Sequence, residues 1–380
     1  MPSRPAAGHL LAGQSFVLRA LGCLGVLGVV IAFSGPATGQ QIDSVWLTPS
    51  SGDWADASNW SSAAFPNNDE TTQFTATIDA QGGGSYMVSL DTSIAVNGLV
   101  LDAAEAIVQA GDITVQVNGN ADLEAGTFVM DGTLLDGGTW TLGAEGMLTG
   151  NGEVDATLVL GPGGSLAPGF SAGQLTINGN YVQDEGGLLE VDVLGVDPGE
   201  FDSIDITGQA DLGGTLIVDA SEADGLLFGD AVPLLTASAL TPGDKFDEVI
   251  TTGVIDGYFA PTYNPDGVSL GYFQPGDMNR DGFVDEADVS PFALALIRPL
   301  DYFGTYFVFG DESGDINGDG VQDFDDINGF MSLIDGASVS TLIDEINRLN
   351  GVPEPASTGL LAAAFTLPWL RLTGGRKRAL

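Results

Sequence analysis

Short alternating segments separated by glycine-rich turns restrict the fold of this sequence more than any other feature. From about residue 41 to 272 they recur, as in "SYMVSL", "NGLVLD", "DITVQVNG" and "GGLLEVDVLG", with Gly, Asn or Asp between them. Alternation directs every second side chain inward, and Gly-Asn or Asp-Gly supplies the positive φ that a tight turn needs. The pattern predicts a mainly β domain over residues 40–272.

The strand spacing leaves two architectures open for this domain. Strands recur at intervals of roughly ten residues, which suits either a β-sandwich or a β-solenoid. Over residues 90–190, Gly and Asn recur at strand ends, and the segments lack the large aromatic residues that fill a sandwich core. Stacked coils instead bury a continuous core of small aliphatic side chains. We therefore favour a β-solenoid, with a β-sandwich as the alternative.

The amino-terminal segment has the composition of an export signal. Arg4 and Arg19 precede the apolar run "ALGCLGVLGVVIAF" at residues 20–33, and the small residues of "SGPATGQQ" follow. A basic start, a short apolar stretch and small residues before a cleavage point are typical of a secretory signal peptide. We expect residues 1–39 to be this signal and the protein to be exported.

Cleavage of that segment restricts the chemistry that the exported chain can perform. The one cysteine, Cys23, and the one histidine, His9, both lie within it. Without a thiol or an imidazole, Ser-His-Asp and Cys-His catalysis and zinc sites of the His/Cys type are excluded. Any chemistry then depends on carboxylates, hydroxyls or a hard metal ion.

Charge is distributed very unevenly along the chain. The formal net charge is −42, and all 52 acidic residues lie between residues 40 and 358. The basic residues in that region are Lys245, Arg280, Arg298 and Arg348. Such a body repels phosphate backbones and anionic lipid, so we do not expect nucleic acid as a partner.

Two stretches resemble surface proteins that contain autotransporter-type β-strand repeats. The first is "WADASNWSSAAFPNNDETTQFTATID" at residues 54–79. The second is "GNGEVDATLVLGPGGSLAPGFSAGQLTINGNYVQDEGGLLEVDVLG" at residues 150–195, continued by "FDSIDITGQADLGGTLIVD" at residues 201–219. The resemblance implies an extended right-handed β-helix at the cell surface, with no active site to transfer to this chain.

An enzymatic role is the alternative that must be weighed. A pair of carboxylates can hydrolyse a glycoside, but in so acidic a chain close pairs arise by chance. Polysaccharide lyases of β-helix shape need a basic residue near the substrate, and Lys245 is the single basic residue within residues 40–272. Trp46, Trp54 and Trp60 could stack on sugars, although we favour a role in capping the open end of the solenoid. We expect no catalytic site; the alternative is a secreted polysaccharide-active enzyme or carbohydrate-binding protein.

The stretch "GDMNRDGFVDEADV" at residues 276–289 has the spacing of a calcium-binding loop. Counted from Asp277, alternate side chains point inward, Gly282 at position 6 permits a sharp turn, and position 7 offers its backbone carbonyl. Position 12 is Asp, where an EF-hand usually has Glu. The predicted ligands are the side chains of Asp277, Asn279, Asp281, Asp285 and Asp288 and the carbonyl of Phe283.

The same pattern returns 38 residues later in "DINGDGVQDFDD". Apolar residues after each loop follow the i, i+3, i+4, i+7 spacing of a helix, namely Val289, Phe292, Ala293 and Leu296, then Ile327, Phe330, Met331 and Ile334. Two loops in register, each followed by a matching helix, predict two Ca²⁺ sites. The ligands of the second site are Asp315, Asn317, Asp319, Asp323 and Asp326 and the carbonyl of Val321.

A calcium loop that is followed but not preceded by a helix, and that occurs twice, resembles the dockerin type I module. Pro275, Gly276 and Gly314 interrupt the segments before the loops. The resemblance covers residues 273–338 and implies an antiparallel pair of loop–helix units, calcium-dependent folding and metal ligands at the positions named above. It also implies a cohesin-like or other surface protein as a partner.

Two features depart from cellulosomal dockerins. Loop positions 10 and 11, which carry small hydroxyl residues there, are Glu286 and Ala287 in the first loop and Phe324 and Asp325 in the second. The segment between the units is also longer and rich in aromatic residues, which are Tyr302, Phe303, Tyr306, Phe307 and Phe309. These rings either clasp the helices together, which we favour, or dock the module on the β domain.

The carboxyl-terminal segment resembles the PEP-CTERM sorting signal. It has Pro-Glu-Pro at residues 353–355, an apolar run at residues 359–370 and the basic end "GRKRAL". The run is shorter than the ~20 apolar residues of a membrane-spanning helix. The resemblance over residues 352–380 implies processing by an exosortase-type enzyme after transient anchoring in the inner membrane. We expect residues 339–351 to be a linker.

These features together predict an exported, calcium-binding protein of the cell surface or extracellular matrix. Its expected role is structural, adhesive or protein-binding, and an extracellular polysaccharide is a further candidate partner.

Overall fold

The computed structural model describes residues 39–253, 257–336 and 338–351. The expected sorting segment, 352–380, and all but the last residue of the expected signal peptide lie outside the described residues. The described chain is mainly β, and its α-helices all follow the last strand. In that part, no helix has the length and apolar character needed to cross a membrane.

Strands separated by turns make up residues 40–273, which we call the β region. They are β1 (Gln40–Val45), β2 (Gly52–Asp53), β3 (Thr72–Ile78), β4 (Tyr86–Leu90), β5 (Ile94–Val96), β6 (Gly98–Ala110), β7 (Thr114–Val117), β8 (Ala121–Leu160), β9 (Ser165–Pro168), β10 (Gln174–Ile177), β11 (Tyr181–Gln183), β12 (Leu188–Asp192), β13 (Ser203–Ile206), β14 (Gln209–Asp211), β15 (Thr215–Asp219), β16 (Ala231–Thr236), β17 (Ala239–Leu240), β18 (Glu248–Thr252), β19 (Tyr258–Asn264) and β20 (Gly267–Phe273). A short 3-10 helix, η1 (Ala57–Asn59), follows β2.

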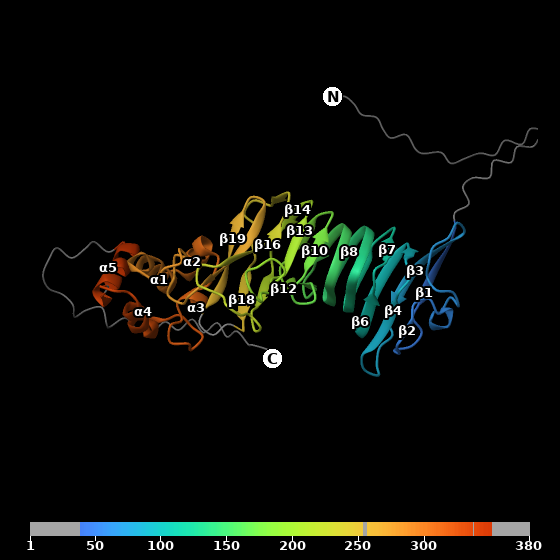
Figure 1. Ribbon diagram of the computed structural model, residues 1–380, viewed down its shortest axis with the longest axis horizontal. Helices are drawn as coiled ribbons and strands as arrows, with labels where there is room; N and C mark the ends of the chain where they lie inside the picture. Colours follow the sequence, from blue (N-terminus) through green and yellow to red (C-terminus); the bar gives the residue numbers. More distant parts are fainter. Residues whose placement is uncertain (1–38, 254–256, 337, 352–380) are drawn as a thin grey trace, which may run out of the picture. The chain divides into compact units, whose positions relative to one another are not determined.

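Parallel pairing between successive coils organises most of the β region (Figure 1). Tyr86 of β4 pairs with Ala106 of β6, and Thr215 of β15 pairs with Glu248 of β18. The same parallel relation links β1 to β3, β3 to β6, β6 to β8, β8 to β10 and β10 to β13. These strands therefore bond to a strand one coil later, which differs from the antiparallel sheets of a β-sandwich.

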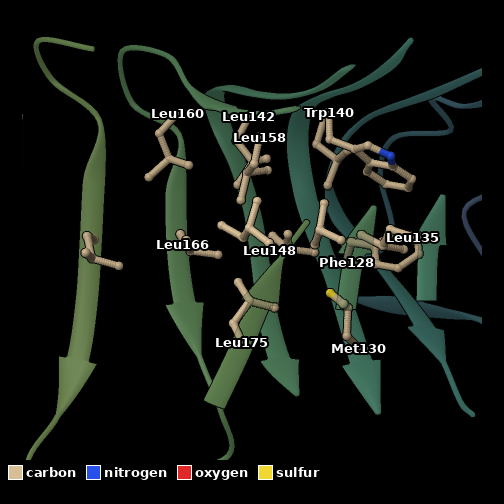
Figure 2. Close-up of a cluster of buried hydrophobic side chains, with 14 of the residues drawn as sticks. Phe128, Met130, Leu135, Trp140, Leu142, Leu148, Leu158, Leu160, Leu166 and Leu175 are labelled. Atoms are coloured by element: carbon tan, nitrogen blue, oxygen red, sulfur yellow. The ribbon is translucent and has the colours of Figure 1, made fainter. Parts of the chain in front are cut away.

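Inward-facing side chains from these strands form one continuous apolar core. In β3, for example, Phe74, Ala76 and Ile78 are buried, while the alternate residues are more exposed. Figure 2 shows a section of this core, in which leucines from neighbouring coils pack against one another. Period-2 alternation is therefore the sequence property that builds the core.

Aromatic residues also contribute to this core. The rings of Phe128 and Trp140 meet edge to face, with centroids 5.7 Å apart, and both residues are fully buried (Figure 2). The expectation that residues 90–190 lack large aromatic core residues was therefore wrong. An edge-to-face pair fills the interior of the coil as several aliphatic side chains would.

Glycine is required where the backbones of neighbouring coils approach closely. A Cβ atom on Gly138 would lie 1.6 Å from the carbonyl oxygen of Gly119, and one on Gly146 would lie 1.8 Å from that of Leu123. Gly138 also has a φ of +68°, a conformation that other residues rarely adopt. The glycine-rich composition thus reflects close coil stacking as well as turns.

Three tryptophans pack together beside the first strands. Trp46, Trp54 and Trp60 are each at most 2% exposed, and their rings meet edge to face. Trp54 Nε1 donates to the carbonyl of Pro66 at 3.1 Å, and Trp60 Nε1 donates to the carbonyl of Trp54 at 2.8 Å. Because these rings are buried in the core, they offer no exposed face on which a sugar could stack.

The other end of the β region changes to antiparallel pairing. β19 and β20 form an antiparallel hairpin, and β20 also pairs antiparallel with β16. Residues 274–351 follow this hairpin, and we call them the helical module. It contains η2 (Glu286–Asp288), α1 (Val289–Ile297), α2 (Pro299–Tyr306), α3 (Gly310–Ser313), η3 (Phe324–Asp326), α4 (Ile327–Leu333) and α5 (Val339–Leu349).

The stretch expected to be a linker, residues 339–351, instead forms helix α5 over most of its length. The side chain of Ser338 caps its first turn, and Leu342 is buried against the rest of the module. Arg298 Nη2 donates to the carbonyl of Leu349 at 2.6 Å, which fixes the end of α5 to the end of α1. The apolar stripe of Leu342, Ile346 and Leu349 explains why this segment packs against the core of the helical module.

The aromatic segment between the two loops takes both of its expected roles. Tyr302 is buried in the core of the module, where its hydroxyl contacts Ser313 Oγ and donates to the carbonyl of Met278. Phe307, in contrast, meets Tyr263 of β19 edge to face, and Lys245 Nζ lies 4.4 Å from its ring centroid. This segment therefore packs the helices together and also contacts the β region.

Candidate metal centre

The first loop, Asp277–Asp288, is organised by carboxylates that accept backbone N–H groups. Asp277 Oδ1 accepts from the N–H of Asp281 at 3.2 Å, and its Oδ2 accepts from that of Gly282 at 2.9 Å. Gly282 has a φ of +91°, so the sharp turn expected at loop position 6 is present. The side chain at position 1 thus closes the first half of the loop.

Asp288, at position 12, holds the two ends of the loop together. Its Oδ1 accepts from the N–H groups of Met278 and Asn279 at 2.7 and 2.9 Å, and its Oδ2 accepts from that of Asp285 at 2.8 Å. Asp285 Oδ1 in turn accepts from the N–H of Ala287, which completes a capping box at η2. Helix α1 follows directly, so the Asp288 carboxylate both closes the loop and takes part in the capping box before the helix.

The second loop, Asp315–Asp326, repeats this arrangement. Asp326 Oδ1 accepts from the N–H groups of Ile316 and Asn317 at 2.9 and 3.0 Å, and its Oδ2 accepts from that of Asp323 at 2.8 Å. Asp315 Oδ2 accepts from Gly320 N–H at 2.6 Å, and Asp323 caps η3 as its counterpart caps η2. The 38-residue sequence repeat is therefore also a repeat of hydrogen-bond geometry.

The remaining predicted ligands occupy the middle of each loop. Asn279 Oδ1 accepts from the N–H of Asp281, and Asp281 Oδ1 accepts from that of Phe283. Asn317 and Asp319 do the same in the second loop, where Asp319 accepts from Val321 N–H. Phe283 and Val321 have hydrocarbon side chains without a donor atom, so the backbone carbonyl is the group that these positions can contribute.

Burial places two of these carboxylates in an unfavourable environment for a charge. Asp277 and Asp288 are fully buried, and burial raises the pKa of each to about 6. The two ion pairs found in the described part of the chain, Arg298–Asp301 and Arg348–Glu345, involve other carboxylates. Buried carboxylates without an ion-pair partner are the kind of group that a bound cation stabilises.

The donor set fits a hard cation, although the carboxylates are not clustered. Within residues 39–253, 257–336 and 338–351, no three Asp, Glu, His or Cys side chains are grouped so that they could hold a metal ion. A loop of this type also uses an Asn side chain and a backbone carbonyl, and it prefers oxygen ligands throughout. At position 12 the Oδ2 atoms of Asp288 and Asp326 each accept one N–H and keep a second lone pair for a metal, whereas their Oδ1 atoms already accept two.

Sequence reasoning missed three residues that fix the first loop in place. The Tyr258 hydroxyl donates to the backbone carbonyl of Asp277 at 2.7 Å, and the Tyr302 hydroxyl donates to that of Met278 at 3.0 Å. Arg280, at loop position 4, donates from Nη1 to the carbonyl of Pro261 at 2.8 Å. The one signal in the sequence was Arg280 itself, the single basic residue in either loop.

The described part of the chain has a cleft at the first loop and another on the β region. One of about 410 Å³ lies beside the first loop and is lined by Val284, Asp285, Glu286, Leu333, Ile334 and Asp335. The other, of about 200 Å³, lies on the β region and is lined by Ser171, Asp192, Leu194, Asp219, Ser221 and Glu222. Both combine carboxylates with apolar side chains.

Comparison with known proteins gives a partial similarity. No family model matches this chain. Over 165 residues it is 33% identical to the adhesin BmaC autotransporter of Brucella suis biovar 1 (strain 1330). The matched part is 42% of this chain but 5% of that adhesin, so the chain spans a small fraction of its length. The similarity and the mainly β structure fit an autotransporter-like β-strand protein.

Proposed function

We propose that this chain is an exported surface protein with an adhesive or structural role, and that its helical module binds two Ca²⁺ ions. The observation that carries the calcium proposal is the pair of loops with the same ligand spacing and the same hydrogen bonds. The ions would be held by the twelve residues predicted above, ten through side chains and Phe283 and Val321 through carbonyls. Calcium would then supply the positive charge that the buried Asp277 and Asp288 lack.

The proposed role of the β region is that of a spacer or adhesive surface. Its parallel stacked strands bury a continuous core, and in β8 they leave the carboxylates of Glu124, Asp131, Glu145, Glu153 and Asp155 exposed. We infer a right-handed solenoid, as the autotransporter resemblance implies. The partial similarity to an adhesin supports a surface location and an adhesive role.

The helical module supplies the proposed protein-binding surface. Phe283, Val321, Phe324 and Leu333 are between 46% and 70% exposed, and Leu333 lines the cleft beside the first loop. Exposed apolar side chains of this kind are typical of a surface that a partner covers. A cohesin-like or other surface protein is the proposed partner, and an extracellular polysaccharide is a candidate ligand of the β region. Exosortase-type processing is part of the same proposal for residues 352–380.

The proposal is for a binding protein rather than an enzyme. In the acidic cleft of the β region, Asp192 and Asp219 are neighbours on paired strands. The hydroxyl and N–H of Ser221 lower the pKa of Asp219, whereas a glycosidase needs a carboxylic acid whose pKa is raised. This pair therefore gives no support to the polysaccharide-active alternative.

A calcium titration of the exported chain tests the proposal. Isothermal titration calorimetry is expected to give two sites, and helical circular dichroism is expected to increase as they fill. Asp288→Ala and Asp326→Ala should each remove one site and leave the other. Absence of calcium binding in the unmodified chain would reject the proposal, as would binding that neither substitution alters.

A further inference from the structure

The two loops share their internal geometry but differ in what surrounds them. The first loop lies against the β19–β20 hairpin, which ends the β region. In the second loop Asp319, Gly320 and Val321 are exposed, and the N–H of Gln322 donates to Asp311 of the helical module rather than to the hairpin. Loop position 4 is Arg280 in the first loop and Gly318 in the second.

Hydrogen bonds join the first loop to β19, and a cation–π contact joins it to β20. The Tyr258 hydroxyl of β19 donates to the carbonyl of Asp277, and Arg280 Nη1 donates back to the carbonyl of Pro261 in the same strand. The Arg280 guanidinium also lies over the ring of Phe273 in β20, 5.9 Å from its centroid. One side chain of the hairpin therefore bonds to the loop backbone, and one side chain of the loop bonds to the hairpin backbone.

Apolar packing strengthens the same junction. Tyr258, Ala260 and Phe273 of the hairpin belong to one buried cluster with Met278 of the loop and Phe292 of α1. Tyr258 and Met278 are at most 2% exposed. Opening the hairpin would therefore expose apolar surface of the loop as well, so the two segments should open together.

From these contacts we infer that Ca²⁺ in the first loop stabilises the β19–β20 hairpin, while Ca²⁺ in the second loop does not. This inference rests on the proposed calcium binding and adds a division of roles between the two sites. Ligation of Asp277 and Asp281 would fix the loop backbone. That backbone is joined to β19 through the hydroxyl of Tyr258 and the guanidinium of Arg280. Because the ion binds only the closed arrangement, local opening of the hairpin becomes less frequent as the site fills.

Hydrogen exchange measured by mass spectrometry on the full exported chain tests this inference. Peptides covering residues 258–273 are compared with calcium and with a chelator. At a free calcium concentration 100 times the dissociation constant of the first site, exchange that requires local opening should slow by up to about a hundredfold. The β3–β4 peptides, far along the chain from either loop, serve as the internal reference.

Asp281→Ala and Asp319→Ala form a matched pair for assigning the effect. Both side chains are exposed, both occupy loop position 5, and each accepts the N–H of the residue two positions later. Asp281→Ala should abolish the calcium-dependent slowing at residues 258–273. Asp319→Ala should leave it intact.

Tyr258→Phe tests the connection itself, because it removes the hydroxyl that bonds to Asp277 and keeps the ring. This variant should still bind two calcium ions but should show at least a severalfold smaller slowing of exchange in the hairpin. Tyr263→Phe is the control in the same strand, since the Tyr263 hydroxyl accepts from Phe246 N–H and not from the loop. The control should retain the full response.

Calorimetry on the same samples separates the two levels of the argument. If no calcium binds, the proposed function fails, and this inference fails with it. If two ions bind but exchange at residues 258–273 does not change, or changes equally in Asp281→Ala and Asp319→Ala, this inference is overturned and the calcium proposal stands.

Discussion

The rings of Phe292 in α1 and Phe330 in α4 stack face to face, with centroids 3.9 Å apart and planes within 4° of each other. Each lies four residues after position 12 of its own loop, and both are fully buried. Equivalent residues of the two loop–helix units therefore meet each other at the centre of the module. This contact covers part of the apolar face of each helix with a ring of the other helix.

Truncation of one ring should destabilise the core of the helical module. Phe330→Ala is expected to lower the free energy of unfolding by about 3–5 kcal/mol, since it removes a fully buried ring and leaves a cavity. Denaturant unfolding followed by helical circular dichroism in calcium measures the loss. Phe324→Ala is the control, because Phe324 is 63% exposed and should change stability by less than about 1 kcal/mol. Equal effects of the two variants would contradict the packing.

Coil stacking predicts an unusual cost for a single methyl group. Gly138→Ala would place its Cβ against the carbonyl of Gly119 and should destabilise the β region by roughly 3 kcal/mol or more. Gly199 also has a positive φ but has no neighbouring atom within 4 Å of an added Cβ. Gly199→Ala should therefore cost only the backbone strain of about 1 kcal/mol. Thermal unfolding of both variants measures the difference, and similar melting temperatures would count against close stacking.

The spacing of apolar residues and glycines along the sequence predicted the strands, the loop turns and the helices after the loops. Alternation located the strands, and loop spacing located the turns at Gly282 and Gly320 and the helices that follow. The apolar residues expected on the first helix, such as Val289 and Phe292, are buried. These properties are set within a few residues, so a sequence displays them directly.

Features that depend on distant partners were not predictable in this way. The bond from Tyr258 to Asp277 joins a strand to a loop, and nothing near either residue indicates it. Helix α5 was missed because its apolar stripe is short and becomes informative only when α1 provides a surface for it. Trp140 was missed as a core residue because only its contact with Phe128, earlier in the same strand β8, shows that the core accommodates large rings.

Lys245 provides a test of contact between the β region and the aromatic segment. Its Nζ lies 4.4 Å from the ring centroid of Phe307 and 5.0 Å from that of Phe303. Lys245→Met keeps the length of the side chain but removes the cation, and it should cost about 1 kcal/mol of stability. Lys245→Arg keeps the charge and should cost less. Denaturant titration of both variants checks the order, and a Met variant as stable as the original would show that the cation contributes nothing.

Asp202 predicts a defined pH dependence of stability. This buried carboxylate accepts the N–H groups of Gly173 and Asp192 at 2.6 and 2.9 Å, yet burial outweighs these bonds and raises its pKa from 3.8 to about 6. The folded state therefore holds the proton more tightly than the unfolded chain does. The resulting stabilisation is fully present below about pH 4 and is lost as the pH rises to about 6.

Asp202→Asn should remove this dependence. The amide cannot accept both N–H groups, so the variant should be less stable than the original at pH 4 by one hydrogen bond, about 1 kcal/mol. As the pH rises from about 4 to about 6, the original loses stability at this position and the variant does not, so the difference should shift in favour of the variant by roughly 1–2 kcal/mol. Urea unfolding of both proteins at a series of pH values measures this difference, in which the titration of all other carboxylates cancels. A difference that stays constant over this range would show that Asp202 is ionised in the folded state at pH 4, with solvent or the two N–H groups compensating for its burial.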